Sequence, residues 1–203
     1  MQEKRRGMLL VVSGPSGTGK GTLCNMLLES DPSLRFSVSV TTRKPRDYER
    51  EGVHYYFVSD EQYDRLLRED ALLEHATVHA NRYGTPRKPI EELIEQGYNV
   101  ILDIDPQGAK TVIAKWPECV SIFILPPSYE ALRQRLHTRN TEKEEEVQRR
   151  LNNAKGEIEQ MHVYQYAVVN GDGEEGKQKA FAQLQAIVAA EKNRTSRYFP
   201  VIE

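Results

Sequence analysis

Runs of mostly hydrophobic residues recur along the chain, separated by longer stretches in which apolar residues follow a helical spacing. An apolar run without alternation predicts a strand that is buried on both faces. Between the first two runs, Leu23, Met26 and Leu27 share one face of a helix expected over residues 22–30. Strands that alternate with helices predict an α/β fold, with a parallel sheet flanked by helices. The four runs are residues 8–12, 99–105, 120–125 and 166–170.

The pattern changes in the segment 36–89. Residues 36–40 alternate between apolar and polar side chains, which is typical of a strand with one exposed face. Residues 59–62 form a capping box and predict the start of a short helix. We therefore expect a small antiparallel insertion here. Half of the ten tyrosines lie between Tyr48 and Tyr83, which suits either a ligand-lining surface or ordinary β-propensity.

Residues 128–160 are highly charged and have a helical spacing. A second capping box, Thr141 to Glu144, predicts that one helix ends near Asn140 and that another begins. Arginines lie on both sides of the acidic run 144–146. Such a segment is usually a solvated helix face, but its arginines would instead face a polyanion if one binds nearby. The pattern alone leaves both interpretations open.

The composition limits the classes of protein to consider. The 203 residues carry 28 Lys and Arg against 30 Asp and Glu, a net charge of -2, whereas general nucleic-acid binders are usually strongly basic. No apolar run approaches the roughly 20 residues of a membrane span, and the first run is too short for a signal peptide. Cys24 and Cys119 cannot form a disulfide framework. We expect a soluble, cytoplasmic protein with two free buried thiols and with no membrane or nucleic-acid partner.

The segment after the first apolar run has the chemistry of a phosphate-binding loop. Gly14, Gly17 and Gly19 precede Lys20, and the strand before and the helix after supply the context that such a loop requires. Glycines let backbone N–H groups point at phosphate oxygens, and the lysine reaches the terminal phosphates. The expected ligand is therefore a nucleoside triphosphate. One departure is Gly21, which stands where a magnesium-binding Ser or Thr is usual.

Further motifs follow in order along the chain at residues 39–46, 52–57, 73–74, 83–85, 101–108 and 126–128. Together with the P-loop they closely resemble the guanylate kinase family over about residues 7–170. The resemblance implies transfer of a phosphoryl group from ATP to GMP, and also to dGMP, in purine nucleotide metabolism. It further implies Mg²⁺ as the cofactor and a monomer or small homo-oligomer.

The resemblance also implies three structural parts. The P-loop core would comprise residues 1–35, 90–127 and 157–203. Residues 36–89 would form the GMP-binding insertion, and residues 128–156 a helical lid. The lid and the insertion are expected to close over the ligands, because water in the site would waste ATP.

The residues expected at the acceptor site suit a guanine nucleotide. Arginines supply forked, permanently charged donors for its phosphate, and tyrosine hydroxyls add neutral donors. The Glu74 carboxylate can accept N1–H and the exocyclic amine of guanine, whereas adenine presents an acceptor at N1. Ser39 can donate to O6, and Thr85 can contact the same edge. The predicted GMP-binding residues are Ser39, Arg43, Arg46, Tyr55, Glu74, Tyr83, Thr85 and Asp105.

The expected catalysis relies on positive charge. Charge spreads over the oxygens of the transferred group, so closing cations over that group is the main device. The phosphate of GMP is already anionic at neutral pH, so no general base is needed. The predicted catalytic residues are Lys20, Arg46, Arg139 and Arg150. The predicted ATP-binding residues are Gly14, Pro15, Ser16, Gly17, Thr18, Gly19, Lys20, Gly21, Thr22, Arg135, Arg139 and Asn170.

Two carboxylates follow a buried strand at the edge where a parallel sheet binds its ligands. Asp103 resembles the acidic residue that orients magnesium through water, and Thr22 is a second candidate ligand. Asp105 resembles a residue nearer to the substrate. A carboxylate at such a strand end can also simply cap the next helix. The sequence leaves these alternatives open.

Two other functions fit part of the pattern. A kinase of a phosphorylated sugar on the same scaffold would share the P-loop but would have no use for Ser39 and Glu74. A non-catalytic guanylate-kinase-like binding module would lack working ATP and lid residues, whereas Lys20 and the lid arginines are present here. The sequence therefore favours an active kinase of GMP.

Overall fold

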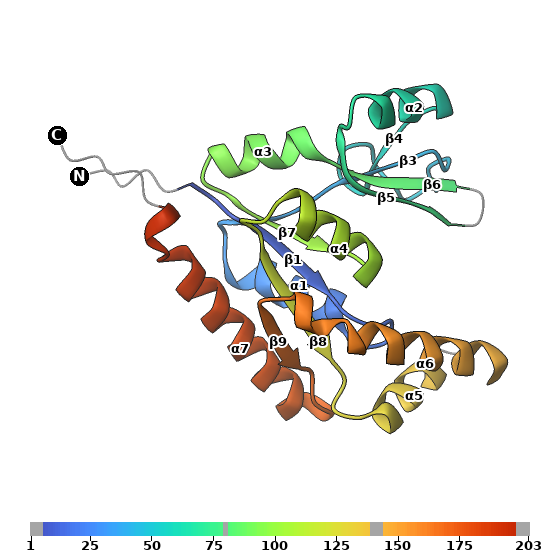
Figure 1. The fold of residues 1–203 in the computed structure, drawn as a ribbon, viewed down its shortest axis with the longest axis vertical. Coiled ribbons are helices and arrows are strands. Elements are labelled where there is room, and N and C mark those ends of the chain that lie inside the picture. The colour runs from blue at the N-terminus through green and yellow to red at the C-terminus, as the bar shows by residue number, and fades with distance from the viewer. Residues whose placement is uncertain (1–5, 79–80, 139–143, 198–203) are drawn as a thin grey trace.

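The computed structural model describes residues 6–78, 81–138 and 144–197. Its centre is a sheet of five parallel strands in the order β2-β7-β1-β8-β9 (Figure 1). Each of the four apolar runs forms one of these strands, which confirms the expected α/β fold. The strands are β1 (Leu9–Ser13), β2 (Leu34–Phe36), β7 (Asn99–Asp103), β8 (Val120–Leu125) and β9 (Tyr166–Val169).

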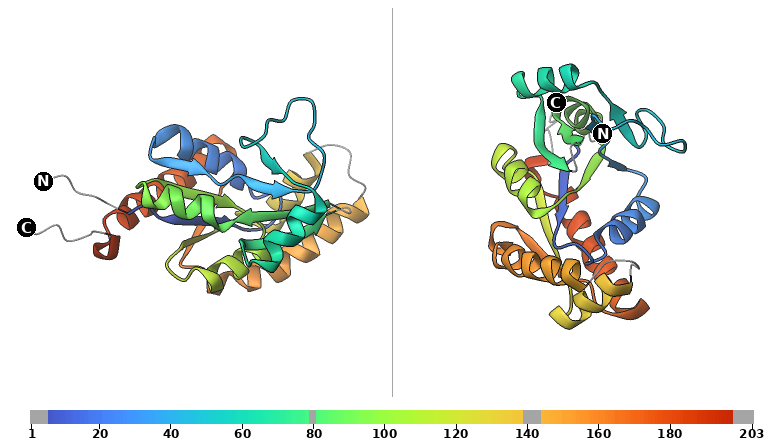
Figure 2. Two further views of the ribbon diagram at one scale, coloured as in Figure 1. Left: turned by 90° about the horizontal axis from the view of Figure 1, so that it is seen from above. Right: turned by 90° about the vertical axis from the view of Figure 1, so that its right-hand side faces the viewer.

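Helices cover both faces of this sheet (Figure 2). Because side chains alternate along a strand, β1 contributes to two separate cores. Leu10 and Val12 pack with residues of α1 and α7. Leu9 and Val11 pack on the other face with residues of α3 and α4. The four helices are α1 (Lys20–Ser30), α3 (Arg87–Glu95), α4 (Pro106–Lys115) and α7 (Gly173–Lys192).

A second sheet has the strand order β4-β3-β6-β5. Its β3–β6 and β5–β6 pairs are antiparallel, and β4 pairs parallel to β3. Tyr63 of α2 packs with Val40 and Leu72 of this sheet. Ser59 and Gln62 form the expected capping box at the start of α2. The elements are β3 (Ser39–Thr41), β4 (Tyr55–Phe57), α2 (Asp60–Arg68), β5 (Leu72–Val78) and β6 (Asn81–Pro86).

The single strand expected over residues 36–40 was a wrong prediction, because the segment is divided between the two sheets. Phe36 ends β2 and pairs with Ile101 in the main sheet, whereas Ser39 begins β3 in the small sheet. The Ser37 N–H still donates to Ile101 O at 3.0 Å, so the chain leaves the main sheet directly after this residue. Alternation could not reveal the change of sheet, because it records only that one face of a strand is exposed.

Two further helices, α5 (Tyr129–Thr138) and α6 (Glu144–Glu159), lie in the expected lid segment. They project on the same side of the core as the small sheet (Figure 1). The Ser128 hydroxyl accepts the Ala131 N–H at 3.0 Å at the start of α5. The expected helix break near Asn140, with its capping box, lies outside the described residues. Two 3-10 turns lie at Met161–Val163 and Thr195–Arg197.

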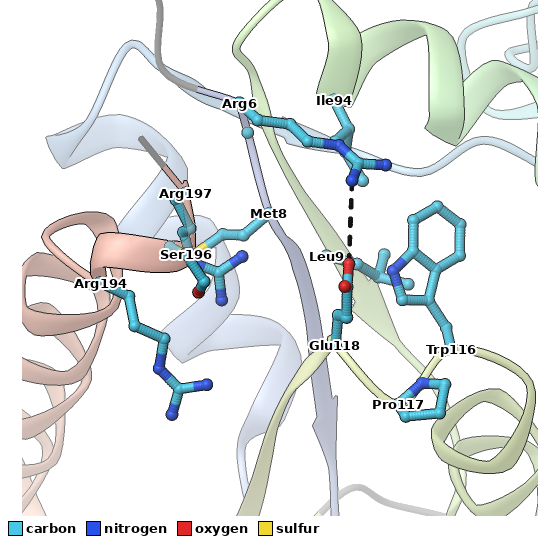
Figure 3. Close-up of a pocket in the computed structure, with 11 residues that line it drawn as sticks. Arg6, Met8, Leu9, Ile94, Trp116, Pro117, Glu118, Arg194, Ser196 and Arg197 are labelled. Atoms are coloured by element: carbon cyan, nitrogen blue, oxygen red, sulfur yellow. Dashed lines mark ion pairs between the residues drawn. The ribbon is translucent and has the colours of Figure 1, made fainter. Parts of the chain in front are cut away.

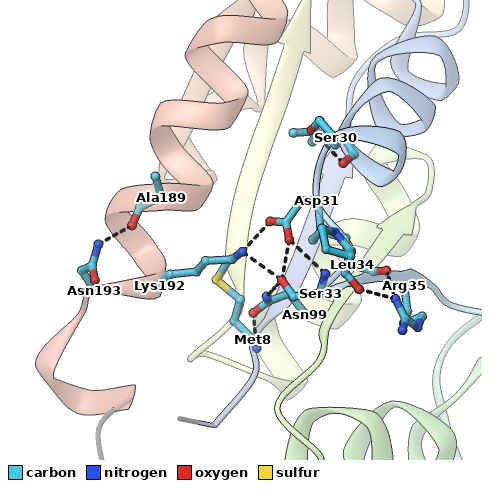
Figure 4. A network of polar contacts seen from close by, with 12 residues as sticks. Met8, Ser30, Asp31, Ser33, Leu34, Arg35, Asn99, Ala189, Lys192 and Asn193 are labelled. Atoms are coloured by element: carbon cyan, nitrogen blue, oxygen red, sulfur yellow. Dashed lines mark hydrogen bonds and ion pairs between the residues drawn. The ribbon is translucent and has the colours of Figure 1, made fainter. Parts of the chain in front are cut away.

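Polar contacts tie the last long helix to the amino ends of the strands (Figure 4). Asn99 accepts the Met8 N–H at 3.2 Å and donates from Nδ2 to Ser33 Oγ at 2.9 Å. Lys192 donates to Ser33 Oγ at 2.8 Å and to the Asp31 carboxylate. These contacts join α7 to the segment that connects α1 with β2.

Both cysteines are buried free thiols, as expected. Burial raises the pKa of both, that of Cys119 to about 11, so Cys24 and Cys119 stay protonated at neutral pH. In the described parts of the chain, no helix is long and apolar enough to cross a membrane.

Candidate active site

The expected phosphate-binding loop joins β1 to α1 at the carboxyl end of the main sheet. Gly14, Gly17 and Gly19 have φ angles of 138°, 87° and 86°, which residues with side chains rarely adopt. A Cβ at Gly14 would lie 2.3 Å from Ile124 O of β8. The curvature of the loop and the close approach of the neighbouring strand therefore both require glycine.

The Lys20 ammonium folds back over this loop. It donates to Gly14 O at 2.6 Å and to Pro15 O at 3.1 Å. Burial lowers the pKa of Lys20, and the nearby Asp103 and Glu157 carboxylates oppose that shift. An anionic ligand in the loop would compete with the two carbonyls for the protons of the ammonium group.

Asp103 ends β7 beside the start of α1. Gly21 leaves one side of the first turn of α1 without a side chain. This side faces Asp103, because a Cβ at Gly21 would lie 3.4 Å from Asp103 Oδ2. Thr22 projects about 100° further around the helix and lines the cavity described below. Desolvation raises the pKa of Asp103, and Lys20 opposes that shift. The two predicted metal ligands thus face different surroundings.

A cavity of about 380 Å³ opens between the P-loop and the loop after β9. Asn170, which is 7% exposed, donates from Nδ2 to Thr18 O at 2.7 Å, and its Oδ1 has no hydrogen-bond partner among the described residues. Arg135 of α5 donates to Asn170 O at 2.9 Å, Gly171 O at 2.8 Å and Asp172 Oδ1 at 2.7 Å. The lid segment is therefore tied to this wall. The cavity is lined by Gly17, Gly19, Thr22, Arg135, Asn170, Gly171, Gly173 and Lys177.

One predicted catalytic arginine of the lid segment reaches the P-loop. Arg150 Nη1 donates to Ser16 Oγ at 3.4 Å, and Arg150 Nε donates to Glu146 at 3.4 Å. The structure therefore brings Arg150 to the loop, across 134 residues of sequence. Arg139, the other predicted catalytic arginine of this segment, lies outside the described residues.

Arg43, in the segment after β3, lies beside Tyr55 and Tyr83 of the small sheet. The guanidinium carbon of Arg43 is 5.5 Å from the Tyr55 ring centroid, and the centroids of the two tyrosine rings are 6.0 Å apart. The tyrosines come from β4 and β6, the strands on either side of β3. Three of the side chains predicted to bind the acceptor phosphate are therefore neighbours.

Glu49 organises both arginines predicted at the acceptor site, although the sequence interpretation did not single it out. Its carboxylate accepts from Arg43 Nη2 at 2.8 Å, from Arg43 Nη1 at 3.0 Å and from the Arg46 backbone N–H at 2.8 Å. The hydrogen bonds from Arg43, followed by that from Arg46, lower the pKa of Glu49 to about 2. The available sequence signal was an acid three residues after an arginine in a proline-containing turn.

Glu74 and Thr85 face each other across β5 and β6. They are paired in the antiparallel register, and Thr85 Oγ1 donates to Glu74 Oε1 at 2.5 Å. The β3–β6 register pairs Val40 with Gly84, and its continuation brings Ser39 level with Thr85. Burial raises the pKa of Glu74, and the hydrogen bond from Thr85 opposes that shift. Thr85 is 1% exposed, and its hydroxyl proton is used in the hydrogen bond to Glu74.

The first turn of α4 closes against Glu74. A Cβ at Gly108 would lie 3.2 Å from Glu74 Oε2. Asp105 caps this helix, because its Oδ1 accepts the Gly108 N–H at 2.8 Å. The sequence left open whether Asp105 lies near the substrate or caps the next helix, and the structure shows that it caps α4. The cap also brings a second carboxylate near Glu74, where it contributes to raising the pKa of that residue.

A cavity of about 240 Å³ lies at the amino ends of the strands and holds none of the predicted site residues (Figure 3). Each of its three arginines pairs with a carboxylate of the protein, Arg194 with Glu191 at 3.2 Å. Arg6 pairs with Glu118 at 3.8 Å, and Arg197 pairs with the buried Glu191 at 3.0 Å. The candidate site is therefore at the other end of the sheet.

Comparison with known proteins gives the family. The family model described as guanylate kinase matches residues 6–191. The chain belongs to the guanylate kinase family. It is 49% identical to a guanylate kinase of Symbiobacterium thermophilum, with 97% of this chain and 92% of that protein covered. It is 46% identical to one of Caldanaerobacter subterraneus, with 97% and 94% covered.

A solved structure of the family has the same fold. The crystal structure of guanylate kinase from Anaplasma phagocytophilum matches with a TM-score of 0.72 and 37% sequence identity. The match covers 98% of this chain and 94% of that chain. The small sheet and the helices of the lid segment therefore belong to a fold shared with a guanylate kinase over nearly its whole length.

Proposed function

We propose that this chain transfers the terminal phosphoryl group of ATP to GMP, and also to dGMP, giving ADP and the nucleoside diphosphate. The observation that carries the proposal is the pairing of Glu74 with Thr85 on the small sheet that also holds Tyr55 and Tyr83 beside Arg43. The carboxylate proposed to read the base and the arginine proposed to bind the phosphate are thus both carried by the small sheet and the loop that follows β3.

On the acceptor side, Glu74 reads guanine by accepting both N1–H and the exocyclic amine. Thr85 fixes one of its oxygens, and Ser39 lies level with Thr85 to donate to O6. Arg43 and Arg46 bind the phosphate together with the tyrosine hydroxyls. Asp105 acts through its cap on α4 and through its charge near Glu74.

On the donor side, the P-loop amides and Lys20 hold the triphosphate. The cavity next to the loop receives the adenosine part of ATP. Asn170 supports this assignment, because it lines the cavity and its Nδ2 donates to Thr18 O, which holds the loop after β9 against the P-loop. Arg135 shapes this wall through its bonds to the loop after β9.

Magnesium fits the donors at the end of β7. The Asp103 carboxylate is a hard oxygen ligand of the kind that Mg²⁺ binds, and its Oδ2 lies 3.4 Å from a Cβ placed at Gly21. Asp103 would therefore hold the ion, directly or through water, and Thr22 would contact the nucleotide instead. When bound with ATP, Mg²⁺ supplies positive charge to the phosphate oxygens.

Catalysis in this proposal is electrostatic. Lys20, Arg46 and Arg150 would surround the transferred group with positive charge, and Arg139 would join them from the lid segment. The lowered pKa of Lys20 results mainly from burial, so bound phosphate would restore the usual preference for its charged form. The acceptor oxygen is already anionic, so no carboxylate has to remove a proton.

The first test is a coupled assay of ADP formation with GMP, dGMP, AMP, CMP and UMP. We expect rapid turnover with GMP and a preference over AMP of at least about 100-fold, because adenine would leave Glu74 without its two donors. Absence of turnover with GMP would overturn the proposed activity. Faster turnover with AMP would overturn the role of Glu74.

A variant pair tests the donor site. Lys20→Ala should lower kcat by about 100-fold or more, since it removes a cation from the transferred group, while GMP binding measured by calorimetry stays within about twofold. Lys179→Ala removes an exposed lysine of α7 that pairs with Glu175 and should leave both unchanged. Equal loss of ATP and GMP binding in Lys20→Ala would instead indicate a damaged fold.

A further inference from the structure

Arg46 has little to hold its side chain apart from one neighbour. Its backbone N–H is fixed by Glu49, but the side chain is exposed. Within residues 6–78, 81–138 and 144–197, its guanidinium makes a single hydrogen bond, from Nη1 to the Tyr48 hydroxyl at 2.8 Å. A free arginine side chain loses rotamer entropy when a ligand orders it. A partner that orders Arg46 beforehand reduces that cost.

Tyr48 is itself held, although it is 65% exposed. Its ring packs edge-on against His54, with ring centroids 6.4 Å apart and an interplanar angle of 81°. His54 is fixed in turn, because its Nδ1 accepts the Arg50 N–H at 3.0 Å and its own N–H donates to Arg50 O at 3.1 Å. A tyrosine has few rotatable bonds, so it provides a rigid support.

The chemistry of the contact leaves Arg46 available for a phosphate. The tyrosine oxygen takes one of the five guanidinium N–H groups, and four remain. The hydrogen bond to Tyr48 also restricts the orientation of the Arg46 side chain. The Arg43 side chain is oriented instead by its two hydrogen bonds to Glu49. The side chains of Arg43 and Arg46 are thus held by different residues of the same loop, Glu49 and Tyr48.

We propose that Tyr48 is a positioning residue that orients Arg46 toward the acceptor phosphate. The inference rests on the proposed function, since it assigns Tyr48 a role in binding GMP. It predicts that removing one hydroxyl from an exposed side chain weakens GMP binding, leaves ATP binding unchanged and leaves the fold intact.

The test compares Tyr48→Phe with the unaltered protein. We expect the KM and the calorimetric Kd for GMP to rise about 3- to 10-fold, the range for loss of one ordinary hydrogen bond. The KM for ATP and the midpoint of thermal unfolding should not change. Tyr98→Phe is the matched control. The guanidinium carbon of Arg35 lies 4.1 Å from the Tyr98 ring centroid, so Tyr98 also contacts an arginine, but it does so at the amino end of β7. Unchanged GMP constants in Tyr48→Phe would overturn the inference.

A double-mutant cycle separates positioning from direct contact. In an Arg46→Ala background, Tyr48→Phe should cause no further change in the Kd for GMP, because the group that Tyr48 positions is gone. The same 3- to 10-fold loss in both backgrounds would show that Tyr48 acts independently of Arg46 and would refute the positioning role. If the unaltered protein shows no turnover or binding with GMP, the proposed function fails before this inference is reached.

Discussion

The Glu49 carboxylate binds both terminal nitrogens of the Arg43 guanidinium, at 2.8 and 3.0 Å. A forked pair of this kind sets the plane of the guanidinium as well as its position. Arg43 is therefore aligned beside Tyr55 before any phosphate binds. In the proposed function, Glu49 thus prepares Arg43 to bind the phosphate of GMP.

Glu49→Gln should raise the KM for GMP on the order of 10-fold, because an amide cannot accept from both Arg43 nitrogens. The KM for ATP should not change. The pKa of Glu49 is about 2, so its carboxylate is ionised throughout the usual assay range and the effect should be constant from pH 6 to pH 9. Steady-state kinetics with Glu69→Gln, an exposed glutamate of the same insertion, as control would check this. A KM for GMP within twofold of the original would contradict it.

Gly108→Ala should weaken GMP binding without loss of stability. The new methyl group would lie 3.2 Å from Glu74 Oε2 and would displace that carboxylate. In the helix itself, alanine is favoured over glycine by up to about 1 kcal/mol. The midpoint of thermal unfolding and the KM for GMP, measured on one preparation, should therefore both rise, because the fold becomes more stable while GMP binding weakens.

Gly156→Ala is the control that measures only the gain in helix stability from alanine, because a Cβ at Gly156 meets nothing within 4 Å. It should raise the unfolding midpoint in the same way as Gly108→Ala. An unchanged KM for GMP in Gly108→Ala would show that Glu74 moves aside freely and does not depend on the first turn of α4.

Glu74→Gln should lower the preference for GMP over AMP by about 10- to 100-fold, the range for loss of a charged hydrogen bond. Only ionised Glu74 can accept both guanine donors. Burial raises the pKa of Glu74, so GMP affinity should begin to fall, as the pH is lowered, at a higher pH than an ordinary glutamate would give. The KM for GMP measured from pH 5 to pH 8 should show this loss in the unaltered protein and not in Glu74→Gln.

Asp105→Asn tests in which direction the pKa of Glu74 moves when a neighbouring negative charge is removed. Asparagine keeps the cap on α4 but removes a negative charge that contributes to the raised pKa of Glu74. The acidic loss of GMP affinity should therefore move to lower pH. A shift to higher pH, or the same acidic loss in Glu74→Gln, would assign the titration to another group.

Asp31→Asn should destabilise the fold by about 1 kcal/mol at pH 7, after allowance for solvent screening of a partly exposed pair. Burial opposes ionisation of Asp31, but hydrogen bonds from Lys192 and Ser33 outweigh it and lower its pKa. A lowered pKa gives stability that is present above the unfolded value, near pH 3.9, and is lost as the pH falls through the folded value.

Urea unfolding at pH 7 and pH 3 would measure this contribution. The difference between the two proteins should shrink at pH 3, and Lys192→Met should show coupling to Asp31→Asn in a double-mutant cycle. Strictly additive free energies of unfolding would show that the contact between Asp31 and Lys192 does not hold α7 to the core.

The sequence alone determined the parts of the molecule that depend on local pattern. Apolar runs predicted the buried strands, because a strand covered on both faces can expose no polar side chain. The glycines before Lys20 predicted the phosphate-binding loop, because their backbone angles are confined to glycine. The capping box at Ser59 predicted the start of α2. The resemblance to the guanylate kinase family followed from the order of such local motifs.

Only the tertiary structure decided which groups meet across elements. The register of β5 with β6 brings the Thr85 hydroxyl to Glu74, and the packing of α1 places Gly21 beside the Asp103 carboxylate. The pairing of Asp31 with Lys192 joins residues 161 apart. Sequence periodicity reports on one element at a time, whereas these contacts depend on how separate elements pack, and packing is a property of the whole chain.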